Sequence, residues 1–179
     1  MNYISILRGI NVSGQKKIKM ADLKLLFESL GFENVVTYIQ SGNVLFNTKT
    51  KNKADLKSII EQAIKKTYKF HVPVIIRSKN DFKKIINNLP FKSIDTEKNG
   101  TIVLVTFLSD KPSKDKYTEI QQYVKSPEKL VIKDKEVYLY CPNGYGKSKL
   151  SNNFIENKLS VEATTRSWKS IHKIYDLAE

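Results

Sequence analysis

The sequence predicts an α+β protein built from two fused ferredoxin-like halves, each a βαββα(β) unit with an antiparallel sheet. Two observations predict this fold. The same order of strand and helix patterns occurs twice along the 179 residues, and each half contains two short β-rich segments separated by turn residues, as a hairpin requires. We place the first half at residues 1–90 and the second, which ends in helices, at residues 91–179. The polar stretch from Pro90 to Gly100 is the expected junction.

Six elements are expected in the first half, in the order βαββαβ. Their ranges, from β-rich composition and from apolar residues at helical spacing, are 3–7, 20–30, 35–39, 44–46, 56–64 and 72–76. Gly31 follows the first helix and suits its C-terminal cap. Residues 40–43, with the sequence Gln-Ser-Gly-Asn, are expected to form the hairpin turn.

The pattern restarts after a short helix with apolar residues at 82, 85, 86 and 89. The elements expected in the second half are a strand at 102–108, a helix at 113–124, strands at 130–132 and 137–140, and helices at 150–159 and 168–178. The strongly apolar run 102–108 is typical of a central strand. No strand is expected between the last two helices, so this half should end in a helix where the first half has a strand.

The composition indicates a globular protein. With 40% apolar residues the chain can bury a core, and no apolar run approaches the roughly 20 residues that a membrane helix needs. The N-terminus lacks the features of a secretory signal, so we expect a cytoplasmic protein without a membrane partner. The single cysteine, Cys141, cannot form an internal disulfide, and two histidines are too few for a zinc cluster. We expect no metal and no cofactor.

The net charge of +13 suggests an anionic partner such as nucleic acid. Residues 1–90 carry 16 basic and 6 acidic residues, a net charge of +10, whereas the remainder carries 15 and 12, a net charge of +3. Lysine accounts for 28 of the 31 basic residues in a chain also rich in Asn and Ile, so part of the lysine content is compositional background. The three arginines stand out, because their planar, bidentate side chains are not replaceable by lysine.

The topology places two loops of the first half side by side. In a ferredoxin-like unit the first and third strands are antiparallel neighbours, so the loop with Arg8, Gly9 and Asn11 should lie next to the hairpin turn. That turn contains Ser41, Gly42 and Asn43. One interpretation is a ligand-binding patch, since Gly permits close approach and the polar side chains supply donors. The other is that Gly and Asn only form the turns.

The segment 143–153 contains Gly146, Lys147 and Ser148, which match the end of a phosphate-binding loop. The register fails because the first glycine of that motif would fall at Cys141. A weaker interpretation remains, in which the loop and the following helix start hold an anion beside Lys147. The alternative is a flexible connection with Ser151 as the helix N-cap.

The segment 164–168 predicts a helix start, with Thr165 or Ser167 as the cap and Trp168 as the first buried residue. Arg166 is kept as a candidate site residue, because a cation at a helix start does not complement the helix dipole. We expect Arg166 or Lys147 to contribute a second positive charge to the loop patch that contains Arg8.

Four Gly- or Arg-containing segments of the chain resemble the bacterial domain of unknown function family 1697, and the likeness in spacing and order runs from Met1 to Glu179. The segments are SILRGINVSG from Ser5, YIQSGNVLF from Tyr38, NGYGKSKLSN from Asn143 and TTRSWKSIHKI from Thr164. The resemblance implies a fold and a site in these segments but no reaction. Family members usually carry an Asn between the Arg and Trp of the last segment, where this chain has Ser167.

Two function classes follow. The first is a noncatalytic binder of an anionic ligand, favouring nucleic acid bound weakly and without sequence specificity, because spread lysines neutralise phosphates without reading bases. The second is an enzyme acting on a small phosphorylated or carboxylated metabolite through Arg, Lys, Ser, Asn and backbone donors. A protein-binding scaffold is a third alternative. A Cys141 nucleophile with His172 as its base is disfavoured against a partly buried thiol.

Overall fold

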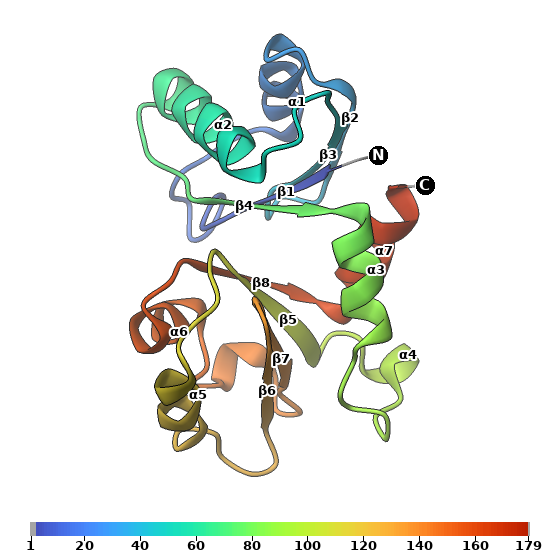
Figure 1. Ribbon diagram of the computed structural model, residues 1–179, viewed down its shortest axis with the longest axis vertical. Coiled ribbons are helices and arrows are strands. Elements are labelled where there is room, and N and C mark those ends of the chain that lie inside the picture. The colour runs from blue at the N-terminus through green and yellow to red at the C-terminus, as the bar shows by residue number, and fades with distance from the viewer. Residues whose placement is uncertain (1–2, 179) are drawn as a thin grey trace. The chain divides into compact units, whose positions relative to one another are not determined.

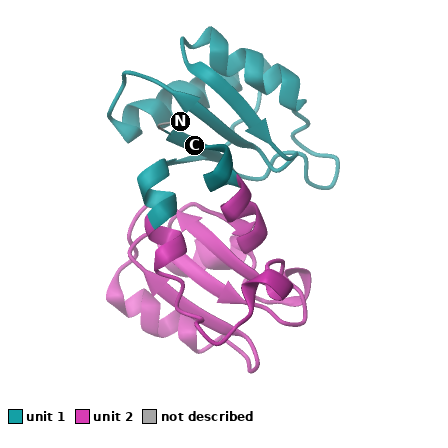
Figure 2. Ribbon diagram, turned by 90° about the vertical axis from the view of Figure 1, so that its right-hand side faces the viewer, with its two compact units in different colours: residues 1–83, 174–179 teal, residues 84–173 magenta. Residues whose placement is uncertain are grey.

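The computed structural model describes residues 3–178 (Figure 1). The chain divides into two compact units, the first comprising the residues up to Lys83 together with those from Ile174, and the second comprising Lys84–Lys173 (Figure 2). The division falls inside helix α3 (Lys79–Asn87) and inside helix α7 (Trp168–Leu177). Each unit contains one four-stranded sheet.

The first unit has the predicted order of elements: β1 (Tyr3–Leu7), α1 (Met20–Ser29), β2 (Glu33–Tyr38), β3 (Asn43–Asn47), α2 (Lys53–Tyr68) and β4 (Val74–Ser78). The strand order is β2-β3-β1-β4, and every neighbouring pair is antiparallel. Helices α1 and α2 cover one face of this sheet (Figure 1). The face is apolar, which explains why both helices carry a buried stripe, with Leu23 and Phe27 on α1 and Ile60 on α2.

The ends of the two helices follow from local chemistry. Helix α1 stops before Gly31, whose φ of +79° is a conformation that glycine adopts without strain. Helix α2 begins after Asn52, whose side chain accepts a hydrogen bond from the N–H of Ala54. Beneath them Phe32 stacks on Phe46 with ring centroids 4.5 Å apart, and Phe27 contacts both rings edge-on. This aromatic group ties α1 to the sheet.

The second unit repeats the arrangement. Its elements, with the part of α3 that it contains, are α4 (Thr96–Asn99), β5 (Val103–Leu108), α5 (Lys114–Gln121), β6 (Lys129–Lys133), β7 (Glu136–Tyr140), the 3-10 turn η1 (Tyr145–Lys147), α6 (Asn152–Leu159), β8 (Ala163–Ser167) and α7. The strand order β6-β7-β5-β8 is again antiparallel throughout. The central strand β5 is buried at every residue, as its apolar run predicts. The fold class is therefore confirmed.

One local prediction was wrong. Residues 164–167 were expected to start a helix, but Thr164, Thr165 and Arg166 lie in β8, which pairs with β5 from Leu104 to Leu108. Adjacent β-branched threonines favour a strand, and this preference outweighs their capping ability here. Of the two candidate caps, Thr165 and Ser167, Ser167 caps α7, since its Oγ accepts from the N–H of Ser170. Helix α7 begins at Trp168. The second half thus contains the fourth strand that the first half has.

The strand registers align the halves residue by residue. Ile4 of β1 pairs with Arg77 of β4, and Val105 of β5 pairs with Arg166 of β8. The junctions Ser78-Lys79 and Ser167-Trp168, where an outer strand runs into a helix, are therefore equivalent positions. No helix formed by the described residues combines the length and apolar character that crossing a bilayer requires.

Candidate functional site

The first two family-like segments meet in the first unit. Ile6 pairs with Asn43, the N–H of Leu7 donates to the carbonyl of Gly42 at 2.8 Å, and Asn11 Nδ2 donates to the carbonyl of Gln40 at 2.9 Å. The loop after β1 and the hairpin between β2 and β3 are thus side by side. This neighbourhood is the one that the ferredoxin-like topology predicts.

The side chains in this neighbourhood also form the turns themselves. Asn11 Nδ2 donates to the carbonyl of Ile18, and its Oδ1 accepts from the N–H of Ile18, so it closes the loop after β1. Asn43 Nδ2 donates to the carbonyl of Tyr38 at 3.0 Å and to Ser41 Oγ at 3.3 Å. These contacts are what the turn interpretation requires, because each amide satisfies backbone groups of its own loop.

The two glycines differ in what they do. Gly42 has a φ of +78°, and a Cβ there would lie 2.6 Å from Ile10 Cδ1 and 2.9 Å from Leu7 Cβ, so the hairpin packs against the loop after β1. Gly9 has a φ of +70° and open space around it. Arg8 is half-buried, and its N–H donates to the carbonyl of Pro73 at 2.9 Å.

The other two family-like segments meet in the second unit around one hydroxyl, Thr165 Oγ1. It donates to Asn152 Oδ1 at 2.6 Å and lies 2.7 Å from Thr106 Oγ1 and 3.1 Å from the hydroxyl of Tyr145. Because a hydroxyl has a single proton, Thr106 and Tyr145 must both donate to Thr165. This network fixes η1 and the start of α6 to β8.

The remaining candidates also lie in the second unit. Gly146 and Lys147 are exposed in η1. The start of α6 is satisfied from within, because Ser151 Oγ accepts from the N–H of Phe154. This is the contact that the flexible-connection interpretation of residues 143–153 predicts. Arg166 is 6% exposed, and its Nη1 donates to Thr164 Oγ1 and to the carbonyl of Thr165.

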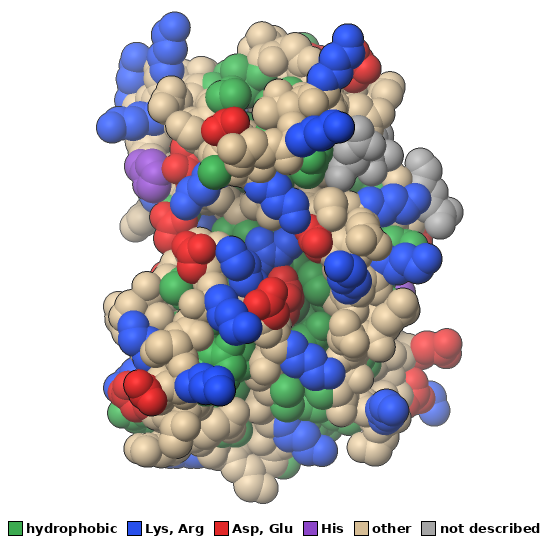
Figure 3. All heavy atoms as spheres, in the orientation of Figure 1, with side chains coloured by type: hydrophobic (Ala, Val, Ile, Leu, Met, Phe, Trp, Pro, Cys, Tyr) green, Lys and Arg blue, Asp and Glu red, His purple; other side chains and the backbone are tan. Residues whose placement is uncertain are grey.

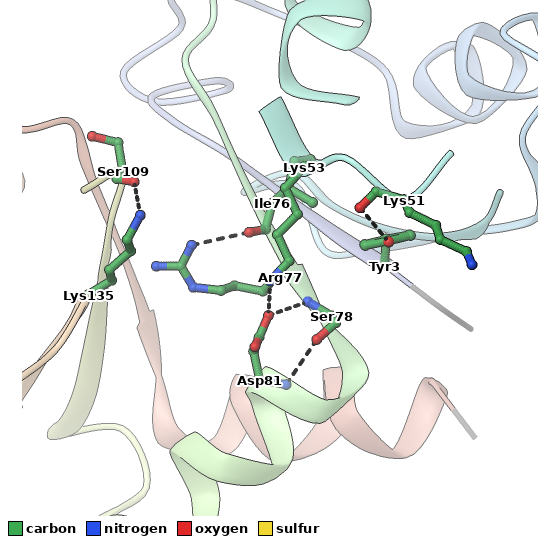
Figure 4. Close-up of polar contacts among 9 residues, drawn as sticks. All are labelled: Tyr3, Lys51, Lys53, Ile76, Arg77, Ser78, Asp81, Ser109 and Lys135. Atoms are coloured by element: carbon green, nitrogen blue, oxygen red, sulfur yellow. Dashed lines mark hydrogen bonds and ion pairs between the residues drawn. The ribbon is translucent and has the colours of Figure 1, made fainter. Parts of the chain in front are cut away.

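The sequence analysis missed the counterpart of Arg166. Arg77 occupies the equivalent position in β4, is 7% exposed, and donates from Nη1 to the carbonyl of Ile76 at 3.1 Å (Figure 4). The signal was present, because an Arg-Ser pair ends the outer strand of each half directly before a helix. The arginines are thus part of the repeat, where they bond to carbonyls of their own strands.

A groove in the first unit has a different composition from these loops. It has a volume of about 780 Å³ and is lined by Tyr3, Thr48, Lys49, Lys51, Ser78, Lys79, Asn80, Lys83 and Tyr175. Four of these residues are lysines and none is acidic. Among residues 3–178, no carboxylate forms an ion pair with any of the four. We call this feature the lysine groove.

The acidic residue at the start of α3 is engaged elsewhere. Asp81 accepts hydrogen bonds from Lys53 Nζ and from the N–H of Ser78, and its own N–H donates to Ser78 Oγ (Figure 4). Burial alone would raise the pKa of Asp81, but the bonds from Lys53 and Ser78 outweigh it and lower the pKa. Asp81 therefore stays ionised and paired with Lys53, and it does not neutralise the lysines of the groove.

Two tyrosines complete the lining. The hydroxyl of Tyr3 donates to the carbonyl of Lys51 at 3.1 Å, which holds the segment before α2 against β1 (Figure 4). Lys79 Nζ lies 5.8 Å from the centre of the Tyr175 ring, at the distance of a cation–π contact. The sequence analysis missed this groove because its lysines come from two separate segments, the connection before α2 and helix α3, and resemble the background of the chain. Figure 3 shows that basic side chains are spread over the displayed face of both units.

Cys141 and His172, weighed above as a nucleophile and its base, have separate environments in the structure. Cys141 is buried, and burial raises the pKa of its thiol to about 11, so the thiol is protonated near neutral pH. His172 is exposed and contacts the Trp168 ring edge-on. Within residues 3–178, no three His, Cys, Asp or Glu side chains converge in a way that could hold a metal ion.

Comparisons with known proteins agree with the fold. A family model described as a protein of unknown function, DUF1697, matches residues 1–138. Among solved structures, a conserved bacterial protein from Streptococcus pneumoniae is similar, with a TM-score of 0.78 and 25% identity over 99% of this chain and 98% of that chain. No curated protein matches the chain. The architecture is therefore shared along its whole length with that protein, and neither description names a ligand or a reaction.

Proposed function

We propose that this chain, which belongs to the DUF1697 family of proteins of unknown function, is a noncatalytic protein that binds a single-stranded nucleic acid in the lysine groove. The observation that carries the proposal is the convergence of Lys49, Lys51, Lys79 and Lys83 on one groove, with no acidic residue among the described residues that line it. Four ammonium groups that share a groove repel one another and attract a ligand that carries several negative charges. A phosphate backbone has this character.

The tyrosines support a nucleic acid over a simple anion. Tyr3 and Tyr175 line the groove together with the four lysines. Proteins that bind single strands without sequence preference combine a positive groove with aromatic rings on which bases stack. Lysine is a point charge that reads no base edge, so we expect weak binding that does not discriminate between sequences.

The first turn of α3 adds to the attraction. Ser78, Lys79 and Asn80 all line the groove at the N-terminal end of this nine-residue helix, where the helix dipole favours negative charge. This contribution is secondary to the lysines, because a dipole end is equivalent to only about half a charge and the carboxylate of Asp81 in the same turn offsets part of it.

The proposal is tested with a labelled oligothymidylate and a double variant. Lys79→Gln with Lys83→Gln removes two charges from the groove, whereas Lys65→Gln with Lys66→Gln removes two from the last turn of α2, outside the groove. We expect the groove variant to lose about tenfold in affinity near 50 mM salt and the control to lose less than about twofold. Equal losses in the two variants would assign any binding to net charge and refute a site at the groove.

A further inference from the structure

A second hollow adjoins the lysine groove. It has a volume of about 530 Å³ and is lined by Leu30, Gly31, Phe32, Glu33, Asn47, Thr48, Lys49, Thr50 and Ile59. Thr48 and Lys49 line both hollows. We call this second feature the Phe32 hollow.

We infer that the two hollows form one continuous binding site. Its ligand is a single-stranded nucleic acid that is long enough to occupy both hollows. This inference rests on the proposed function. Each hollow alone lies within the roughly 300–1,000 Å³ that holds a single small ligand. A small phosphorylated metabolite would fill the lysine groove and leave the Phe32 hollow unused. A strand that crosses the segment Thr48–Thr50 uses both and passes Lys49 on the way.

The two hollows offer different chemistry. Four lysines line the first hollow, whereas Lys49 is the single cation among the described residues that line the second. Leu30, Phe32 and Ile59 give the second hollow an apolar side, and Ile59 on α2 is 41% exposed. Such a surface suits the flat face of a base, which gains from leaving water.

Charge fixes how the strand would lie. Glu33 also lines the Phe32 hollow, and its carboxylate repels a phosphate. The backbone of the bound nucleic acid must therefore follow Lys49 across the junction, with a base turned toward the exposed side chain of Ile59. Because none of these groups selects one base, this arrangement keeps binding insensitive to sequence.

The experiment compares ligands of increasing length. Tripolyphosphate probes the lysine groove alone, and oligothymidylates from a dinucleotide to an octanucleotide probe both hollows. Ile59→Glu places a carboxylate in the Phe32 hollow, and Leu25→Glu on α1 is the matched control, since Leu25 is 64% exposed and lines neither hollow. Thr50→Glu is a second variant in the same hollow, should Ile59→Glu fail to fold.

We expect affinity to rise stepwise with strand length until both hollows are filled, and Ile59→Glu to weaken the longer strands about fivefold while tripolyphosphate binding stays unchanged. Leu25→Glu should weaken neither. Two results would refute the continuous site: oligothymidylate length has no effect beyond the dinucleotide, or Ile59→Glu behaves like Leu25→Glu. Either result would leave the proposed binding in the lysine groove unaffected. If neither tripolyphosphate nor any oligothymidylate binds, the proposed function itself fails.

Discussion

The two junctions between outer strand and helix share a backbone position and differ in chemistry. At the first, Lys79 is half-buried beside Tyr175, and Lys83 follows one turn later in the lysine groove. At the second, Trp168 is 4% exposed and packs edge-on against His172 one turn later. The two units therefore share a fold, but the lysines at the first junction have no counterpart at the second. One junction is charged and open, whereas the other is filled by an indole ring.

The largest expected difference between the two junctions is in how much an alanine substitution lowers the free energy of unfolding. Trp168→Ala should lower the free energy of unfolding by about 3–5 kcal/mol, because it empties a buried aromatic position. Lys79→Ala, at the equivalent position, should cost at most about 1 kcal/mol, the value of a cation–π contact. Urea denaturation followed by circular dichroism measures both. Similar losses would mean that the two junctions play the same structural role.

The next largest effect on stability concerns the first turns of helices α3 and α7. Asp81→Asn should lower the free energy of unfolding by about 1 kcal/mol at neutral pH, because the Asp81 carboxylate pairs with Lys53 and accepts from the N–H of Ser78 at the start of α3. The pKa of Asp81 is lowered in the folded protein, so its stabilisation is present above the unfolded pKa and is lost as the pH falls through the folded pKa.

The measurement for this prediction is urea denaturation of the wild type and Asp81→Asn at neutral pH and at about pH 2, below the ordinary pKa of an aspartate. We expect the difference between them to shrink at the lower pH. Ser170→Ala is the matched change at the equivalent position of α7, where only the hydroxyl contact with Ser167 Oγ is lost, and its small cost should not vary between the two pH values. An Asp81→Asn difference that is constant with pH would contradict the assigned ion pair.

The central strands of the two units also differ in whether a buried hydroxyl has a hydrogen-bond partner. Ser5 Oγ on β1 is buried and has no hydrogen-bond partner among the described residues, whereas Thr106 at the equivalent position of β5 bonds to Thr165. Ser5→Ala should leave stability unchanged or raise it by up to about 1 kcal/mol, and Thr106→Val should lower it by about 1 kcal/mol. Thermal unfolding of the two variants decides the point, and a destabilising Ser5→Ala would show that Ser5 has a partner.

The smallest expected effect concerns the loop after β1, where Arg8 remains a predicted anion-binding residue. If this loop contributes to the binding of the strand, Arg8→Lys should weaken oligothymidylate binding about threefold despite the retained charge, because a bidentate contact is lost. Lys57→Gln on α2 is the control and should change affinity less. Unchanged binding and stability in Arg8→Lys would leave the arginine with a turn role alone.

Local periodicity was enough to predict the fold, but not every element. Strand β1 and helices α1 and α2 are predicted because their apolar residues recur at one period, and β5 is predicted because it is a continuous apolar run. Strand β8 is missed because Thr and Ser serve both as strand residues and as helix caps, and pairing with β5 decides between the two. The choice depends on a partner about 60 residues away, which local sequence does not reveal.

The candidate site follows the same logic. The contact between the loop after β1 and the β2–β3 hairpin was predictable, because β1 and β3 are antiparallel neighbours in the expected topology, which places these two loops side by side. The lysine groove was not, because Lys51, Lys79 and Tyr175 come together only through the packing of three distant segments. A lysine that is background in composition becomes a candidate for binding only when its neighbours in space are known.

The salt dependence of binding tests the central claim most directly. The affinity of the wild type for an oligothymidylate is measured from about 50 to about 200 mM salt and compared with Lys79→Gln/Lys83→Gln and with Lys65→Gln/Lys66→Gln. Four groove lysines on a single strand predict a log–log slope near −2.8, or about a fiftyfold loss across this range. The groove variant should flatten the slope by about 1.4 and the α2 variant should leave it unchanged. A slope that is the same in all three proteins would contradict a binding site in the lysine groove.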